Sequence, residues 1–271
     1  MKLRKYLSRL KRQLMRRSGD TDILEFQCNI CGELTSSKMS DLSREVASCH
    51  ACGSTVRMRA IVHVLSTELF GESLVLPDFP HNKGLHGVGM SDWDGYANPL
   101  AKKLSYTNTY YHQEPMLDIT NISKDQICTM DFMISSDVYE HVLFPVNHAF
   151  ENTTKLLKEN GVFIFTVPYT KKGEETVEHF GQLHDFEIEK KQGEYVLKDT
   201  DGNGTVREFD DLIFHGGPGS TLEMRVFSEK SLMNELSRAG LNNVKVYSEP
   251  FLKYGIFWGD VNWSLPIAAR K

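Results

Sequence analysis

The chain has 271 residues, 40% of them apolar and 25% charged, which suits one large globular domain with a small appendage. No run of about 18 apolar residues predicts a membrane span, and the basic N-terminus lacks the apolar core of a secretory signal. We therefore expect a cytoplasmic protein with reduced thiols. Residues 1–17 hold eight bases and no acid, which leaves 23 bases against 36 acids in the remainder. That acidic body disfavours a nucleic acid partner, because phosphate neutralisation supplies most of such affinity.

Residues 2–17 are predicted to form a basic amphipathic helix, which we treat as a separate unit at residues 1–20. Leu3, Leu7, Leu10 and Leu14 share one face, and cations occupy the rest. Such a helix fits peripheral contact with an anionic membrane surface or with an acidic partner, for example a glycosyltransferase. A solvated tail is the alternative.

Four cysteines within 25 residues give the strongest signal in the sequence. Cys28 and Cys31 form one Cys-x-x-Cys pair, and Cys49 and Cys52 form a second pair 17 residues later. This spacing is typical of a zinc ribbon, which we place at residues 21–55. Four thiolates fill a tetrahedral zinc, so the zinc would be structural. Unconnected free thiols and a redox dithiol are the alternatives, although a dithiol needs only one pair.

Helical and strand patterns alternate from residue 56 onward, which predicts a doubly wound α/β domain over residues 56–271. Residues 171–227 interrupt the alternation as an insertion, with a β-hairpin at 195–209. The acidic turn of that hairpin is favoured over a calcium loop, because Asp210 stands where a bidentate Glu is expected. Helices are predicted at 56–69, 145–159 and 228–239, and strands at 84–89, 106–112, 131–135, 162–167, 244–247 and 262–268.

A glycine turn, GVGMSD at residues 87–92, follows the first of these strands. Glycines at this point let the backbone approach a ligand closely at the sheet edge where α/β folds bind nucleotides. Asp92 stands where a dinucleotide fingerprint has its third glycine, and a carboxylate there would repel a pyrophosphate. A cationic sulfonium cofactor tolerates the carboxylate. A plain structural turn is the alternative.

Residues 131–142 (DFMISSDVYEHV) and 156–168 (LLKENGVFIFTVP) resemble the class I methyltransferases that use S-adenosylmethionine (SAM). The matching parts of that family are a strand with Phe-Asp-Leu-Ile, then Glu-His-Val, a helix ending in Leu-Lys-Pro-Gly-Gly, and a strand. With the cysteine pairs and the GSxxRxR motif at 53–59, the whole chain resembles bacterial methyltransferases of the type 11 kind that carry an N-terminal zinc ribbon, some of them glycan-associated. The resemblance implies a Rossmann-like sheet of seven strands.

The resemblance also implies roles for particular residues. Asp118 would contact the adenine, with Ile119 beside its ring, and Asn108 stands where the family usually has an acid for the ribose. The full set of implied cofactor residues is Gly87, Gly89, Ser91, Asp92, Asn108, Asp118, Ile119, Ser135, Ser136, Asp137 and His141.

The insertion is expected to hold the acceptor and its base. An oxygen acceptor needs a base, and imidazole suits neutral pH. His184 and His179 are the first candidates and His215 the third, and an ordinary surface or core histidine is the alternative for each of them. The sequence therefore predicts a zinc-containing SAM methyltransferase acting on O or N of a glycan or small metabolite. An RNA methyltransferase and a non-catalytic binding module remain as alternatives.

Overall fold

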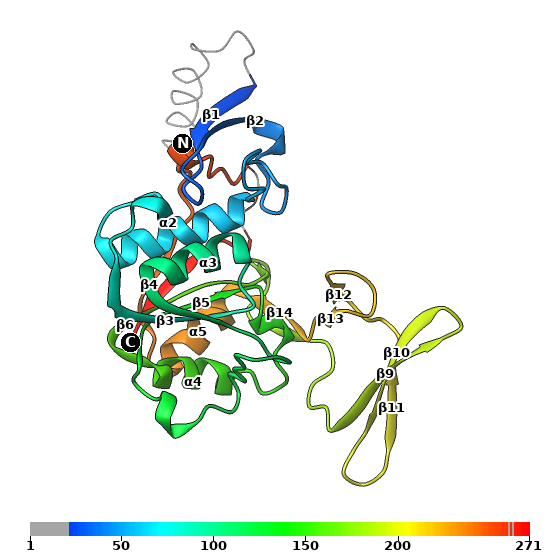
Figure 1. The fold of residues 1–271 in the computed structure, drawn as a ribbon. Coiled ribbons are helices and arrows are strands. Elements are labelled where there is room, and N and C mark those ends of the chain that lie inside the picture. Colours follow the sequence, from blue (N-terminus) through cyan, green and yellow to red (C-terminus); the bar gives the residue numbers. More distant parts are fainter. Residues whose placement is uncertain (1–21, 260, 262) are drawn as a thin grey trace.

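The computed structural model describes residues 22–259, 261 and 263–271 (Figure 1). The predicted basic helix at residues 2–17 lies outside these residues. The described chain begins with an antiparallel pair, β1 (Ile23–Gln27) and β2 (Leu34–Lys38). The turn between these strands carries the first cysteine pair, and the loop that precedes α2 carries the second. None of the helices in the described part of the chain has the length and hydropathy of a membrane span.

A mostly parallel six-stranded sheet forms the centre of the molecule. Strand β16 runs antiparallel to both of its neighbours, and the other neighbouring strands pair in parallel. In spatial order the strands are β15 (Asn242–Val246), β16 (Ile267–Arg270), β6 (Leu157–Thr166), β5 (Met130–Ser136), β3 (Asn82–Met90) and β4 (Leu104–Thr109).

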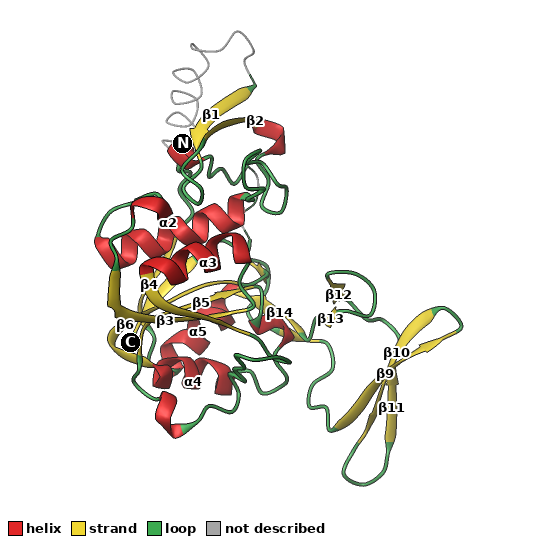
Figure 2. Cartoon of the chain, viewed as in Figure 1, coloured by secondary structure: helices red, strands yellow, loops and turns green. Residues whose placement is uncertain are grey.

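Helices cover both faces of this sheet (Figure 2). On one face lie α2 (Val56–Phe70) and α3 (Asp94–Lys103), and on the other α4 (Asn147–Leu156) and α5 (Glu229–Arg238). Alternate strand residues supply the two cores, since Phe132 packs with α2 and α3 whereas Met133 packs with α4 and α5. This alternation is what a strand buried on both faces requires. Helix α2 begins after the cap residue Thr55 and ends at Gly71, which is left-handed.

Residues 169–228 leave the central sheet and return to it. The first strand of this segment, β7 (Tyr169–Thr170), pairs in parallel with its last strand, β14 (Arg225–Ser228). Strand β8 (Val177–Glu178) pairs antiparallel with β14. A three-stranded sheet projects from the body of the molecule (Figure 1). It consists of β9 (Asp185–Lys191), β10 (Glu194–Thr200) and β11 (Val206–Phe209), and the pair β12 (Phe214–His215) and β13 (Thr221–Leu222) lies between it and the body.

Short 3-10 turns complete the described elements. They lie at Met39–Asp41, Leu76–Asp78, Lys124–Gln126, Tyr139–His141 and Leu252–Tyr254.

Several predicted elements differ from the structure. The sheet has six strands among the described residues instead of seven, because the stretch after β4 makes only the single bridge Tyr110↔Met116 and Pro115 has no N–H to donate. The helix predicted at 145–159 ends at Leu156, since the carbonyls of Lys155 and Leu156 accept from the backbone N–H groups of residues 128 and 129 instead of continuing it. Helix α3, which contains Pro99, was not predicted.

Candidate functional site

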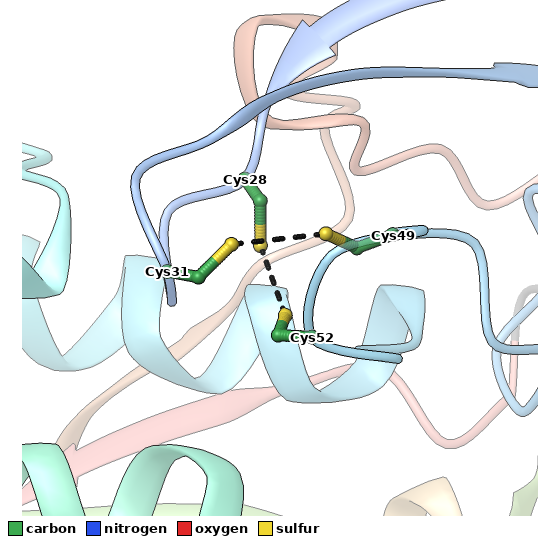
Figure 3. A group of neighbouring side chains, drawn as sticks. All are labelled: Cys28, Cys31, Cys49 and Cys52. Atoms are coloured by element: carbon green, nitrogen blue, oxygen red, sulfur yellow. Dashed lines mark hydrogen bonds between the residues drawn. The ribbon is translucent and has the colours of Figure 1, made fainter.

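The four cysteines converge on one point beside α2 (Figure 3). The Sγ atoms of Cys28 and Cys52 are 3.6 Å apart and those of Cys31 and Cys49 are 3.8 Å apart. Tetrahedral zinc with Zn–S bonds of about 2.3 Å requires S···S separations of about 3.8 Å. A disulfide would require about 2.05 Å. The arrangement therefore fits four thiolates around one metal ion.

A buried arginine joins this cysteine module to the rest of the protein. Arg59 of α2 donates to the carbonyl of Ser54 at 2.8 Å, to Ser48 Oγ at 2.8 Å and to the carbonyl of Gly255 at 3.0 Å. The second cysteine loop, the helix and the C-terminal segment are thus held by one side chain. Such a fully buried guanidinium is stable only with its hydrogen bonds made.

The predicted cofactor residues lie at the carboxyl edge of the central sheet. Strand β4 lies on one side of β3, and the next strand of the chain in this sheet, β5, lies on the other side. The strand order therefore reverses between β3 and β5. Ligands of open α/β sheets bind at such a switch point. The first residues after these two strands, Ser91 and Asp137, both have positive φ angles of 56° and 55°. Residues other than glycine held in this conformation are concentrated at functional sites.

Gly87 and Gly89 have a packing requirement of their own. A Cβ on Gly87 would lie 2.1 Å from the ring of Phe132, and one on Gly89 would lie 1.9 Å from the hydroxyl of Tyr106 and 2.2 Å from Asp92 Oδ2. Any larger residue at either position would displace these side chains. Glycine is therefore needed here by the internal packing, and the predicted contact of both glycines with a cofactor stays a prediction.

Asp92 and Asn108 fasten the turn that follows β3. The backbone N–H of Asp92 donates to Asn108 Oδ1 at 2.9 Å, and Asn108 Nδ2 donates back to the carbonyl of Asp92 at 2.8 Å. The carboxylate of Asp92 points inward and accepts from Tyr106. Burial raises the pKa of Asp92 to about 6, partly offset by that hydrogen bond. Both polar atoms of Asn108 thus take part in the turn, and its predicted contact with the ribose stays a prediction.

Asp118 and Ile119 follow the isolated bridge beyond β4. Asp118 Oδ1 accepts from the N–H of Thr120 at 2.9 Å and from its hydroxyl at 2.7 Å, while Asp118 itself stays partly exposed. Ile119 is buried in the core on the α4 side. One carboxylate oxygen of Asp118 therefore fixes its own turn and the other is left for a ligand.

Asp137, after β5, lies beneath two arginines from the N-terminal part of the chain. Arg44 donates to its two oxygens at 2.6 and 2.9 Å, and Arg57 of α2 lies 3.5 Å away. Burial opposes the negative charge, but these arginines outweigh it and lower the pKa of Asp137. Next to it, Ser136 Oγ accepts from Arg57 at 2.6 Å, and Ser135 is fully buried.

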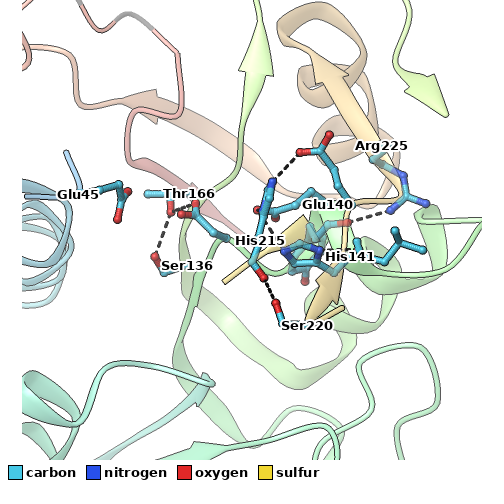
Figure 4. A network of polar contacts seen from close by, with 12 residues as sticks. Glu45, Ser136, Glu140, His141, Thr166, His215, Ser220 and Arg225 are labelled. Carbon is cyan, nitrogen blue, oxygen red and sulfur yellow. Dashed lines mark hydrogen bonds and ion pairs between the residues drawn. The ribbon is translucent and has the colours of Figure 1, made fainter. Parts of the chain in front are cut away.

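One of the three predicted bases, His215, meets the Glu140–His141 pair in a cluster of imidazoles and carboxylates (Figure 4), and His179 joins this cluster through Glu223. His215 Nδ1 and His141 Nε2 each lie 3.7 Å from Glu140 Oε1. Glu223 accepts from His215 Nε2 at 2.8 Å and from His179 Nε2 at 2.9 Å. The remaining candidate, His184, lies elsewhere: it starts the projecting sheet, is 41% exposed and has Asp199 as its neighbour at 3.8 Å.

Arg44 and Arg225 at this edge were not among the predicted site residues, and neither was Arg57. Arg44 is 93 residues away from Asp137 in the sequence, and only folding brings the two side chains together. Arg225 is fully buried and donates to the carbonyl of Tyr139 at 2.9 Å, which braces the turn that carries Glu140. A lone arginine in a sequence gives no sign of burial, so no local pattern could have identified either residue.

Comparison with known proteins gives distant structural likenesses only. The sequence matches no known protein family and no curated protein. An N1-methyltransferase of 1,6-didemethyltoxoflavin from Burkholderia thailandensis, solved with S-adenosylhomocysteine, is 13% identical over 79% of this chain and 77% of its own, with a TM-score of 0.43. A SAM-dependent methyltransferase from Clostridium acetobutylicum is 12% identical over 80% and 91%, also at 0.43.

The amino pentose methyltransferase CalS10 from Micromonospora echinaspora, solved with SAM, is 11% identical over 80% of this chain and 92% of its own, with a TM-score of 0.42. At such identities and scores, these likenesses do not define an activity for this chain.

Proposed function

We propose that this protein is a SAM-dependent methyltransferase whose cofactor binds across the carboxyl ends of β3, β4 and β5. The observation that carries the proposal is the pair of left-handed polar residues, Ser91 and Asp137, on either side of the switch point.

The chemistry of the edge suits a cation-bearing cofactor. Asp137 places a carboxylate at the edge where a dinucleotide site would need room for a pyrophosphate, whereas the carboxylate of Asp92 points inward. SAM carries a sulfonium and an ammonium group, both of which tolerate carboxylates nearby. Ser91, Asp137 and the outer oxygen of Asp118 are the groups that would hold it. When bound, SAM supplies an electrophilic methyl group.

The acceptor would enter from the side of residues 171–227. This segment places His215 3.7 Å from Glu140, three residues beyond Asp137, and links His215 to His179 through Glu223. A cluster of imidazoles and carboxylates at the carboxyl edge is suited to orienting an acceptor and taking its proton. We therefore assign acceptor activation to this cluster instead of to His184, with O or N of a glycan or small metabolite as the acceptor.

We also propose that the four cysteines hold a structural zinc. The four thiolates occupy every tetrahedral position, which leaves none for a substrate. Arg59 holds the zinc-bound loop at Ser48, and Arg44 of the same loop binds the carboxylate of Asp137. The zinc would therefore act on the active site only indirectly.

A binding experiment tests the proposal directly. SAM and S-adenosylhomocysteine should each raise the melting temperature by mass action, by an amount equivalent to about 2.7 kcal/mol at 100 times Kd. NADH should not. Stabilisation by NADH without stabilisation by SAM would overturn the assignment. Incubation with methyl-labelled SAM and either polysaccharide, metabolite or RNA fractions then separates the acceptor classes, and cofactor binding without any transfer would favour a non-catalytic module.

A matched pair of variants on one strand locates the cofactor. Asp137→Asn changes the acid at the carboxyl end of β5, whereas Asp131→Asn changes an acid at its amino end that pairs with Lys158 at 2.7 Å. Both lose one ion-paired carboxylate. Only Asp137→Asn should weaken SAM binding, by about tenfold, as expected for one lost charged contact. Equal affinities in the two variants would place the cofactor elsewhere.

A further inference from the structure

The carboxylate of Glu140 is an unusual feature of the described core. Its side chain is 0% exposed, and neither oxygen has a hydrogen-bond partner. Burial raises its pKa well above the usual range. A carboxylate in such a place costs several kcal/mol unless it is paired or binds a metal. The groups that face Glu140 most closely are two imidazole nitrogens, each 3.7 Å from Oε1.

Both imidazoles are oriented by hydrogen bonds on their far sides. His141 Nδ1 lies 2.7 Å from the carbonyl of Leu222, and His215 Nε2 lies 2.8 Å from a carboxylate oxygen of Glu223. Because a carbonyl and a carboxylate accept, these nitrogens carry the proton. The lone pairs of His141 Nε2 and His215 Nδ1 then face Glu140. A histidine that ligates a metal is held in this way, with its outer N–H on a carbonyl or carboxylate.

The surrounding backbone keeps the three groups together. Arg225 holds the turn of Glu140 through the carbonyl of Tyr139, and the N–H of Met224 donates to the carbonyl of Glu140 at 2.8 Å. Glu223 is itself held by His179 at 2.9 Å. The outer contacts thus come from two separate segments that lock onto each other, as a preformed ligand set requires.

We propose that Glu140, His141 and His215 bind a divalent transition metal ion. The three ligand atoms lie within 4.8 Å of one another. Bonds of about 2.1 Å at tetrahedral angles would bring them to about 3.4 Å, which is a few tenths of an ångström closer than the 3.7 Å separations from Glu140. Two imidazoles and one carboxylate are a ligand set used by zinc and by non-haem iron, and it leaves coordination positions open.

The open side of this site faces solvent through His215, which is 35% exposed, whereas His141 is 13% exposed. His215 is therefore the ligand of this cluster that reaches the solvent. The site depends only on this geometry and not on the methyltransferase proposal. Where that proposal also holds, the open position would admit an oxygen donor of the acceptor.

Metal binding by the full chain tests the site. The protein is loaded with one zinc in the cysteine site, dialysed, and titrated with Co²⁺ by calorimetry and absorption. We expect one further Co²⁺ per chain, with the d–d bands of nitrogen and oxygen ligands and no sulfur-to-cobalt charge-transfer band. His215→Ala should weaken this binding at least a hundredfold, since one of three ligands is lost. His184→Ala, on the projecting sheet, is the matched control and should bind as the wild type does.

The variant Glu140→Gln is expected to fold, and its melting temperature gives a second readout. Because it removes a buried carboxyl group whose oxygens have no hydrogen-bond partner, the metal-free variant should melt no lower than the wild type. It should also lose the rise in melting temperature that Co²⁺ gives the wild type. Unchanged Co²⁺ binding in both Glu140→Gln and His215→Ala, or a cobalt spectrum with only thiolate bands, would overturn the proposal. Failure of SAM to bind would leave this result untouched.

Discussion

Asp92 gives the protein a pH-dependent stability whose size follows from its burial. Its folded pKa of about 6 lies above the ordinary value of 3.8, so the native state binds more protons than the unfolded state between these values. The stability from this group is complete below about pH 4 and is lost as the pH rises through about 6. Between pH 7.5 and pH 5 the linkage relation gives about 1.4 kcal/mol in favour of the acid side.

The variant Asp92→Asn isolates this contribution. Its amide oxygen can still accept from Tyr106, but it cannot take up a proton. Urea unfolding of both proteins at pH 5.0, 6.0 and 7.5 should show the wild type gaining about 1.4 kcal/mol on the variant as the pH falls. By melting temperature the same gain is about 3–5 °C for a chain of this size.

Asp94→Asn is the control, because Asp94 is exposed at the start of α3, two residues away. It should follow the pH dependence of the wild type. Loss of metal from the cysteine site at acid pH affects all three proteins alike and cancels in the difference. The reasoning is refuted if the stability difference between Asp92→Asn and the wild type stays constant from pH 5.0 to 7.5.

Three further outcomes are expected. Cys28→Ser should lose one zinc per chain by elemental analysis and lower the melting temperature, whereas Cys128→Ser, whose thiol is exposed and outside the cluster, should keep both unchanged. Asp118→Asn, which can still accept from Thr120 through its amide oxygen, should weaken SAM binding severalfold in calorimetry while leaving the melting temperature of the free protein within about 2 °C; full affinity would remove Asp118 from the site. Arg44→Ala should lower the free energy of unfolding in urea by about 1–3 kcal/mol, because Asp137 stays ionised and loses its bidentate partner but keeps the hydrogen bond from Thr166. A change below about 0.5 kcal/mol would show that the ion pair contributes little.

Local patterns predicted the elements whose stability is local. The strand at 131–135 and the helix at 56–69 appear almost where they were expected, because a continuous apolar run and a repeating apolar face leave few other structures. Ser228 caps α5 as predicted, through the hydrogen bond from the N–H of Ser231 at 3.0 Å. The hairpin predicted at 195–209 forms as β10 and β11, because its two strands are neighbours in the sequence and need only a local turn to pair.

Cysteine spacing also carried its information locally. Two Cys-x-x-Cys turns each bring a pair of thiolates together, so only the approach of the two pairs had to come from the fold. The result is a cluster whose S···S distances fit the predicted ion.

Elements that depend on distant contacts were missed. Helix α3 forms despite Pro99 because Tyr96, Ala97 and Leu100 pack against the sheet, and that gain outweighs a poor helical sequence. The early end of α4 has the same origin, since residues 128 and 129 take the carbonyls that would have extended it. A seventh strand was expected from the resemblance, and the stretch after β4 makes one bridge only.

The sequence by itself determined which residue types could do chemistry, and the tertiary structure decided which of them meet. Three histidines of the insertion were candidates along the chain, with His184 and His179 ahead of His215, but the fold brings His215 to Glu140, links His179 to it through Glu223, and leaves His184 at the start of the projecting sheet. Arg44 reaches Asp137 across 93 positions of the chain. The physical reason is that a side chain's charge and hydrogen-bonding capacity are fixed by its type, whereas its burial and its partners are set by segments far away in the sequence.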